Sequence, residues 1–177
     1  MLKKVRGFTL IELLIVVAIL GILAALLIPN AITAIQKAKQ KSTMKDIVVI
    51  STAVTDYVTD NGITPTQDGN YTAGSDFYQG LSPFYVKVLP LTDQWGTFYN
   101  AYCGTACDAN YGISGAAGDD FVIASYGRAG QLDPFQFVAT NPEAGLFIVS
   151  QSSHFNNDLV MWNGSWIRAP RSSAAAT

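Results

Sequence analysis

An apolar run near the N-terminus limits what this chain can fold into more than any other feature. The run covers 21 residues from Phe8 to Ile28 and contains a single charged residue, Glu12. About 20 apolar residues are enough for a helix to span the hydrocarbon core of a bilayer. Lys3, Lys4 and Arg6 precede the run. Basic flanking residues stay in the cytoplasm, which predicts that the C-terminal bulk of the chain lies across the membrane.

Two simple explanations of the run are a secretory signal peptide and a plain signal anchor. A signal peptide has a shorter apolar core, followed by a cleavage site with small residues. Here the run is longer, and Pro29-Asn30 follows it. A plain anchor fits the hydropathy alone, but Glu12 argues against it. A carboxylate in a membrane span costs roughly 2.5 kcal/mol or more, so Glu12 is a functional candidate that needs a positively charged partner.

The segment GFTLIE, residues 7–12, resembles the cleavage and methylation signature of type IV pilins and type II secretion pseudopilins. Gly7 fits the residue before the cut, Phe8 the new N-terminus and Glu12 the fifth residue of the mature chain. The resemblance implies that residues 1–7 are a leader peptide. It also implies that a prepilin peptidase cuts between Gly7 and Phe8 and then N-methylates Phe8.

The resemblance also implies a partner for Glu12. In a growing filament its carboxylate would neutralise the Phe8 amine of a neighbouring subunit, a pair that a low dielectric strengthens. A contact between Phe8 and Glu12 of one chain is the alternative, because residues four apart face each other on a helix. Gly21 and Pro29 fall where the family has a helix-loosening Gly and Pro. The implied partners are further copies of the chain, the peptidase, a platform protein and an assembly ATPase that acts indirectly.

The helical pattern continues beyond the apolar run to Asn61. Its second half carries an apolar stripe with a period near 3.6, formed by Ile47, Ile50, Val54, Tyr57 and Val58. Asn61-Gly62 predicts the end of the helix. We expect one helix over residues 8–61, with residues 8–28 in the membrane or the filament core and the second half packed on a head. Pro29 lacks a donor and should kink or locally melt this helix.

Residues 62–177 change character, with more aromatic residues, Gly and Asp. They predict a β-rich globular head, and Asn163-Gly164 predicts a type I′ turn between two strands. The fold class is therefore α+β, a long helix packed on an antiparallel sheet, and it is pilin-like by resemblance. The expected strands are Thr97–Tyr102, Phe121–Tyr126, Phe135–Ala139, Leu146–Ser150, Leu159–Trp162 and Ser165–Arg168.

The sequence has two cysteines, Cys103 and Cys107, and one histidine, His154. A metal site on the cysteines would need further ligands, and in an oxidising compartment a structural disulfide is favoured. His154 lies among polar residues and is expected in a loop or on the surface. The serines carry no nucleophile pattern, which predicts a protein without enzymatic activity. A formal net charge of −2 gives no reason to expect nucleic acid.

Parts of the head resemble the major pseudopilin of type II secretion. They are DQWGTFY at residues 93–99, SYGRAG at residues 125–130 and the later pair Asn157-Asp158. In that family the last two regions build a calcium site, so Asp133 and Asp158, with backbone carbonyls, are the candidate ligands and calcium the candidate cofactor. Ala129 stands where the family has Asp, and an insert over roughly residues 132–155 separates the two regions. The alternative is that the acidic residues are solvated turn residues.

These observations predict a structural subunit of a type IV pilus-like helical filament. Head-to-tail contacts that do not close into a ring generate such a fibre. The precursor would cross the inner membrane once, and the mature chain would lie in a filament at the cell surface or in the periplasm. The main alternative is the major pseudopilin of a periplasmic pseudopilus. A membrane-anchored binding or adhesion module is a lower alternative.

Overall fold

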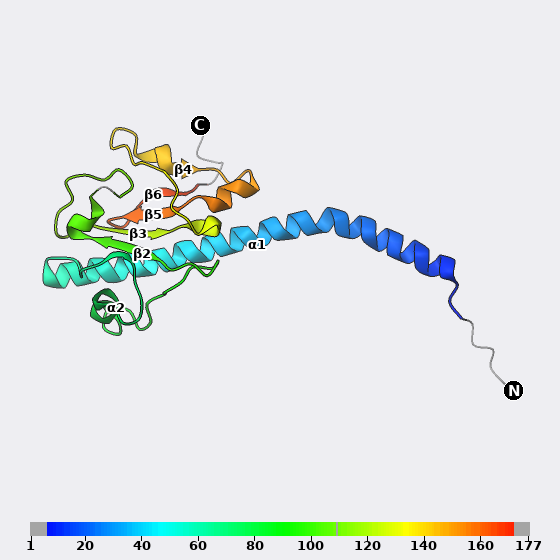
Figure 1. The fold of residues 1–177 in the computed structure, drawn as a ribbon, viewed down its shortest axis with the longest axis horizontal. Coiled ribbons are helices and arrows are strands. Elements are labelled where there is room, and N and C mark those ends of the chain that lie inside the picture. Colours follow the sequence, from blue (N-terminus) through cyan, green and yellow to red (C-terminus); the bar gives the residue numbers. More distant parts are fainter. Residues whose placement is uncertain (1–6, 109, 172–177) are drawn as a thin grey trace. The chain divides into compact units, whose positions relative to one another are not determined.

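A computed structural model describes residues 7–108 and 110–171, and all structural statements below refer to them. The chain divides into two compact units, Met1–Lys37 and Ala38–Thr177. Helix α1 (Leu10–Asn61) is continuous and contributes to both units (Figure 1). The predicted leader, residues 1–7, lies outside the described residues except for Gly7.

Of the two effects predicted for Pro29, a kink or local melting, the local melting is wrong, because α1 continues through this residue. Two neighbouring side chains supply hydrogen bonds to backbone carbonyls around the proline. The amide of Asn30 donates to the Leu26 carbonyl at 3.3 Å, and the Thr33 hydroxyl donates to the Pro29 carbonyl at 3.0 Å. Neither bond replaces the one that the proline removes, which would run to the Ala25 carbonyl four residues earlier.

The predicted C-terminal end of α1 is confirmed at Asn61. Gly62 has a positive φ of 75°, and its backbone N–H donates to the Val58 carbonyl at 2.7 Å. Glycine adopts this left-handed conformation without a Cβ penalty, which ends the helix at this position.

The unit Ala38–Thr177 contains a six-stranded sheet in the order β1-β2-β3-β5-β6-β4 (Figure 1). All neighbouring strands are antiparallel except β4 and β6, which are parallel. The strands are β1 (Asp68–Asn70), β2 (Asn100–Cys103), β3 (Phe121–Ser125), β4 (Leu146–Phe147), β5 (Leu159–Trp162) and β6 (Ser165–Pro170). The short helices are α2 (Asp76–Leu81), η1 (Gly104–Cys107), η2 (Gly127–Ala129), η3 (Pro142–Gly145) and η4 (Ser152–Asn156).

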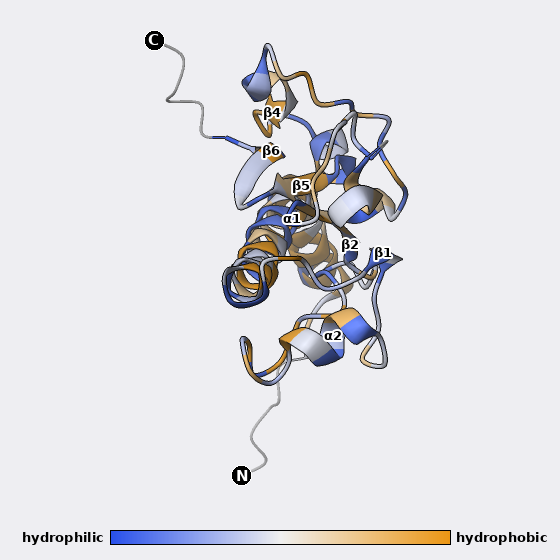
Figure 2. Ribbon diagram, turned by 90° about the vertical axis from the view of Figure 1, so that its left-hand side faces the viewer, coloured by the Kyte–Doolittle hydropathy of each residue, from blue (hydrophilic) through white to orange (hydrophobic). Residues whose placement is uncertain are grey.

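The α+β, pilin-like fold class is confirmed, because the second half of α1 packs on this sheet. The predicted helical stripe supplies the contact: Ile47, Ile50 and Val54 are fully buried and join Ile123 and Leu159 of the sheet in one apolar cluster. Figure 2 colours α1 and the strands by hydropathy. Each fully buried Ile or Val of this kind contributes roughly 1.5–3 kcal/mol.

Strand β3 is buried on both faces, and its side chains alternate between two clusters. Phe121 and Ile123 face the cluster with α1, whereas Val122 and Ala124 face a second cluster on the other side of the sheet. This alternation is the period of two expected for a strand. The sheet therefore carries an apolar core on each side.

The predicted strands are confirmed in part. The type I′ turn is present, because Asn163 and Gly164 both have positive φ, 46° and 79°. The expected strand Leu146–Ser150 is reduced to the two residues of β4. The expected strand Phe135–Ala139 is wrong: its aromatic residues are covered by side chains, with Phe137 against Trp162 at 5.5 Å between ring centroids.

Candidate functional site: the N-terminal segment and the loops of the head

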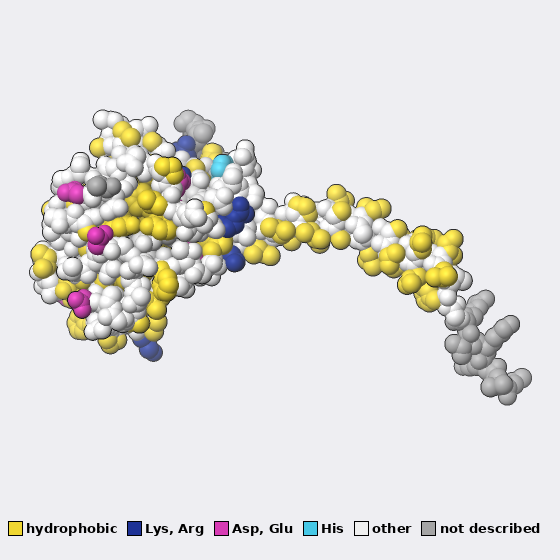
Figure 3. Space-filling model, in the orientation of Figure 1, with side chains coloured by type: hydrophobic (Ala, Val, Ile, Leu, Met, Phe, Trp, Pro, Cys, Tyr) yellow, Lys and Arg dark blue, Asp and Glu magenta, His cyan; other side chains and the backbone are white. Residues whose placement is uncertain are grey.

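The first half of α1 exposes its apolar side chains within its own unit. Between residues 8 and 28 the exposed fraction of the large apolar side chains ranges from 46% at Val16 to 89% at Leu10. Figure 3 shows apolar side chains over this part of the helix. By length and composition α1 could cross a membrane. An apolar surface of this extent requires an apolar environment, such as lipid or other helices.

The start of α1 is fixed by a reciprocal pair of hydrogen bonds between Thr9 and Glu12. The Glu12 carboxylate accepts from the Thr9 backbone N–H at 2.9 Å and from the Thr9 hydroxyl at 2.7 Å. The Glu12 backbone N–H donates to Thr9 Oγ1 at 3.3 Å. This arrangement is a capping box, in which residues at the N-cap and three positions later satisfy each other's free donors.

The capping box gives Glu12 a partner while Phe8 is still joined to Gly7 and has no free amine, so a contact with the Phe8 amine of its own processed chain stays a prediction. Within the chain its carboxylate is bound by Thr9, and the Phe8 side chain is 83% exposed. The Thr-x-x-Glu pattern could have been read from the sequence, and it explains why α1 begins at Leu10 rather than at the predicted Phe8. The contact of Glu12 with a neighbouring chain stays a prediction.

The two N-terminal glycines have open space around them. A Cβ placed on Gly7 or Gly21 would meet no atom within 4 Å. Neither glycine is therefore required by packing among the described residues of its own unit.

In the head, the fold brings together two motif segments that are about 30 residues apart in the sequence. Asp93 is buried, and its Oδ1 accepts from the backbone N–H groups of Trp95 at 2.9 Å and Thr97 at 3.0 Å. Its Oδ2 accepts from the Ser125 hydroxyl at 2.7 Å. Ser125 in turn accepts from the Gly127 backbone N–H at 3.2 Å. The segment 93–99 and the segment 125–130 thus share one hydrogen-bond network.

This network extends to α1 through residues of the first segment. The Gln94 backbone N–H donates to the Thr43 hydroxyl at 3.3 Å, and the Tyr99 hydroxyl donates to the Asp46 carboxylate at 3.1 Å. The Gln94 side-chain amide also donates to Asp46 at 3.3 Å. The motif therefore fastens the loop between α2 and β2 to the helix, which is a structural role.

Gly127 brings the second segment against the third. Its φ is 56°, and an added Cβ would lie 2.6 Å from the Asn157 carbonyl oxygen and 2.9 Å from that of Phe155. A side chain cannot fit at these distances. The three segments that resemble the major pseudopilin therefore converge at one end of the sheet.

Asp158, a candidate calcium ligand, is fully buried at this place. Its Oδ2 accepts from the Tyr111 hydroxyl at 2.9 Å and from the Asp133 backbone N–H at 3.1 Å. Its Oδ1 has no hydrogen-bond partner among the described residues. Burial raises the pKa of Asp158 to about 7, because removal from water disfavours the charged form more than the hydrogen bonds favour it.

The side chains present offer a calcium ion few oxygen ligands, among which the buried Asp158 Oδ1 has no hydrogen-bond partner. The carboxylate of Asp133, the other candidate ligand, forms an ion pair with Arg168. Calcium takes six to eight oxygen ligands, mostly from carboxylates and carbonyls. The described residues contain no group of three or more His, Cys, Asp and Glu side chains that could hold a metal. Ala129 has no oxygen in its side chain and adds no ligand.

The predicted disulfide between Cys103 and Cys107 is absent, and both residues are buried free thiols. The reason is their position: Cys103 ends β2 and joins the apolar cluster with α1, whereas Cys107 lies in the cluster on the other face. The Cys107 thiol donates to the Tyr102 carbonyl at 3.1 Å. Burial raises the pKa of both thiols, that of Cys107 to about 12, so both stay protonated near neutral pH.

His154 lies in η4, as expected for a loop residue. Its Nδ1 is 2.7 Å from the Ile148 carbonyl oxygen and accepts from the Ser150 backbone N–H at 3.3 Å in one tautomer. These contacts connect the imidazole to the backbone of its own loop. The imidazole therefore stabilises the loop between β4 and η4.

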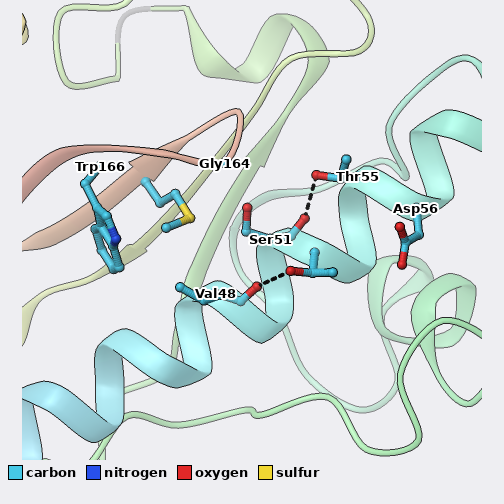
Figure 4. Close-up of a pocket in the computed structure, with 8 residues that line it drawn as sticks. Val48, Ser51, Thr55, Asp56, Gly164 and Trp166 are labelled. Carbon is cyan, nitrogen blue, oxygen red and sulfur yellow. Dashed lines mark hydrogen bonds between the residues drawn. The ribbon is translucent and has the colours of Figure 1, made fainter.

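A groove lies between α1 and the β5–β6 hairpin, and Val48, Ser51 and Trp166 line it (Figure 4). The two threonine hydroxyls in it are used within the helix. Thr52 donates to the Val48 carbonyl and Thr55 to the Ser51 carbonyl, each at 2.9 Å. The groove is therefore a gap in the packing between helix and hairpin whose threonines serve the helix backbone.

Comparisons with known proteins agree with the N-terminal motif and extend into the head. Residues 2–28 match the model of the prokaryotic N-terminal methylation motif. The chain is 33% identical over 135 residues to the type II secretion system core protein G of Aeromonas hydrophila, covering 70% of this chain and 94% of that protein.

Two further relatives carry the same name. That of Vibrio cholerae serotype O1 is 38% identical over 104 residues, which are 55% of this chain and 70% of the relative. That of Dickeya chrysanthemi is 27% identical over 168 residues, which are 87% of this chain and 94% of the relative. No solved structure matches the chain at a significant level.

Proposed function

On the premise that this chain belongs to the type IV pilin and major pseudopilin family, as a relative of type II secretion system core protein G, we propose that it is a major pseudopilin. The family consists of structural subunits and not of enzymes. The observation that carries the proposal is the 94% coverage of the Aeromonas hydrophila protein, which includes the head as well as the N-terminal motif. Of the two filament types expected from the sequence, this likeness favours the periplasmic pseudopilus over the surface pilus.

The chain is synthesised as a precursor, which the apolar half of α1 holds in the inner membrane. The prepilin peptidase removes residues 1–7 and methylates the amine of Phe8. Two features support this step: the match to the methylation motif over residues 2–28, and the position of Gly7-Phe8 before the first residue of α1. A cleavage site outside a helix is accessible, whereas one within a helix would first have to unwind.

The mature subunits then form a filament through the first half of α1, with a platform protein and an assembly ATPase as partners. The exposed apolar side chains of residues 8–28 are buried against neighbouring copies. Gly21 leaves room for a close approach of helices, because nothing lies within 4 Å of its Cβ position. Glu12 meets the Phe8 amine of another copy, and this ion pair selects the register between subunits.

The role of Glu12 is tested by two substitutions that separate its charge from its capping box. In Glu12→Gln the amide still accepts from Thr9, so the helix start is kept and the negative charge is lost. We expect Glu12→Gln to lose filament yield as severely as Glu12→Ala, while both variants still insert into the membrane. Thr9→Ala is the matched control, because it weakens the cap by about 1 kcal/mol and keeps the charge.

The measurement is the fraction of subunit recovered in filaments after overproduction together with the secretion system. Wild-type yield from Glu12→Gln would show that the cap, and not the charge, is what assembly requires. Loss of filaments in Thr9→Ala with normal filaments in Glu12→Gln would point to the same conclusion.

The choice between pseudopilus and pilus is tested by deleting the gene in its host. For a pseudopilin we expect exoproteins to accumulate in the periplasm, and electron microscopy of material sheared from wild-type cells to show no abundant fibres of this subunit. Unchanged secretion together with abundant surface fibres would favour the type IV pilus instead.

A further inference from the structure

Arg168 on β6 is surrounded by side chains of the insert, residues 132–155. Its guanidinium forms an ion pair with the Asp133 carboxylate. It also lies 4.7 Å from the ring centroid of Phe135 and 5.7 Å from that of Phe147. Three residues of the insert therefore contact one arginine of the sheet.

The ionised carboxylate of Asp133, which lies beside Asp158, needs a positive charge. The Asp133 backbone N–H donates to the Asp158 carboxylate at 3.1 Å, so the two residues are direct neighbours. The side chains of Arg168 and Asp133 are only 15% and 20% exposed. A carboxylate in such surroundings is costly unless a cation is near, and the charge of Arg168 also acts favourably on ionised Asp158.

The surroundings of Arg168 suit a guanidinium better than a metal ion. A calcium ion needs oxygen ligands on most sides. Here the aromatic faces of Phe135 and Phe147 cover the cation, and flat guanidinium groups stack on aromatic faces. The positive charge of Arg168 would also repel a divalent ion at this place.

The backbone of the insert is built for a close approach to the strand that carries Arg168. A Cβ on Gly145 would lie 1.9 Å from the Ile167 carbonyl oxygen, so only glycine fits there. The next residues form β4, which pairs in parallel with β6 at Leu146 opposite Ala169. The insert thus adds a strand to the sheet edge directly beside the arginine.

We propose that Arg168 is an internal cation that holds the insert to the sheet, and that the head of this chain folds without calcium. The cation at this place is a side chain, and its partners Asp133, Phe135 and Phe147 all come from residues 132–155.

The proposal is tested on the full chain, purified in detergent, by its melting temperature and its calcium content. We expect the same melting temperature in excess EDTA and in millimolar calcium chloride, and no stoichiometric calcium in equilibrium dialysis. A higher melting temperature in calcium, or one bound ion per chain, would overturn the proposal. This comparison needs no variant and is decided even if the variants below do not fold.

The variant Arg168→Met removes the charge and keeps an apolar stem. We expect its melting temperature to fall by roughly 5–15 °C, because a partly buried carboxylate loses its partner. Arg171→Met is the matched control: it removes the exposed ion pair of Arg171 with Glu143 and should leave the melting temperature nearly unchanged. Equal melting temperatures of the two variants would contradict the role of Arg168.

A double variant separates the ion pair from general packing. In the Arg168→Met background, Asp133→Asn should cost less than it costs in the wild-type chain, because the unpaired charge is then removed. Additive effects of the two substitutions would show that they act independently and would contradict the pairing.

Discussion

The convergence of the motif segments in the head predicts a large effect of a single methyl group at Gly127. Gly127→Ala places a Cβ 2.6 Å from the Asn157 carbonyl oxygen and 2.9 Å from the Phe155 carbonyl oxygen. Both obstacles are backbone atoms and cannot move aside as a flexible side chain would. The residue also has a φ of 56°, which disfavours any residue with a Cβ.

The magnitude has two components. The left-handed backbone conformation costs an alanine about 1–2 kcal/mol. Overpacking against fixed atoms adds about 1–3 kcal/mol. The sum is roughly 2–5 kcal/mol, which lowers the melting temperature of a domain of this size by roughly 4–20 °C.

The assay is thermal unfolding of the full chain in detergent, with Gly164→Ala as the matched control. Gly164 has a similar positive φ of 79°, but a Cβ there would meet nothing within 4 Å. The control therefore has the backbone component without the clash. Equal losses for the two variants would refute the inference that Gly127 is required by its contact with Asn157.

Three further predictions concern the core, the buried acid and the cleavage site. Ile50→Ala should lower the free energy of unfolding by about 2–5 kcal/mol in denaturant titrations, because Ile50 is fully buried, whereas the exposed Ile35 should tolerate the same change. Burial raises the pKa of Asp158 to about 7, so the folded chain holds a proton that the unfolded chain releases above its ordinary pKa near 4. The resulting stabilisation, on the order of 4 kcal/mol at most, is fully present below the unfolded pKa near 4. It is lost as the pH rises through the folded pKa of about 7. Unfolding titrations at several pH values should therefore show a negative slope that is flatter in Asp158→Asn, and identical slopes would contradict the shift. Replacement of Gly7 by a bulky residue should leave the full-length precursor on an immunoblot, and mature protein of normal size would count against the cleavage site.

The parts of the fold that could be predicted from the sequence depend on local patterns. The stripe from Ile47 to Val58 and the Asn61-Gly62 stop predicted α1 and its buried face, and Asn163-Gly164 predicted the hairpin. Strand β1 (Asp68–Asn70) was missed because it is short, polar and contains a glycine. The segment Phe135–Ala139 misled because its aromatic residues serve the packing of Arg168 and Trp162 rather than strand pairing.

The candidate sites likewise could be predicted where their residues are neighbours in the sequence, and not where the fold brings distant residues together. The motif at Gly7, Phe8 and Glu12 is contiguous, so the sequence could identify it, and the capping pattern of Thr9 was also readable there. The ion pair between Asp133 and Arg168 joins residues 35 positions apart, and no local sequence pattern predicts it. The disulfide prediction failed for a related reason, since spacing alone does not tell on which face of the sheet each cysteine lies.

The most direct measurement of the central claim is the N-terminal mass spectrum of the subunit isolated from filaments. If the chain is a processed pseudopilin, its first residue is Phe8, and the N-terminal peptide is heavier than the unmodified sequence by one methyl group. Filaments built from chains that still begin at Met1 would contradict the account. So would filaments whose chains begin at another residue than Phe8 and carry no methyl group there.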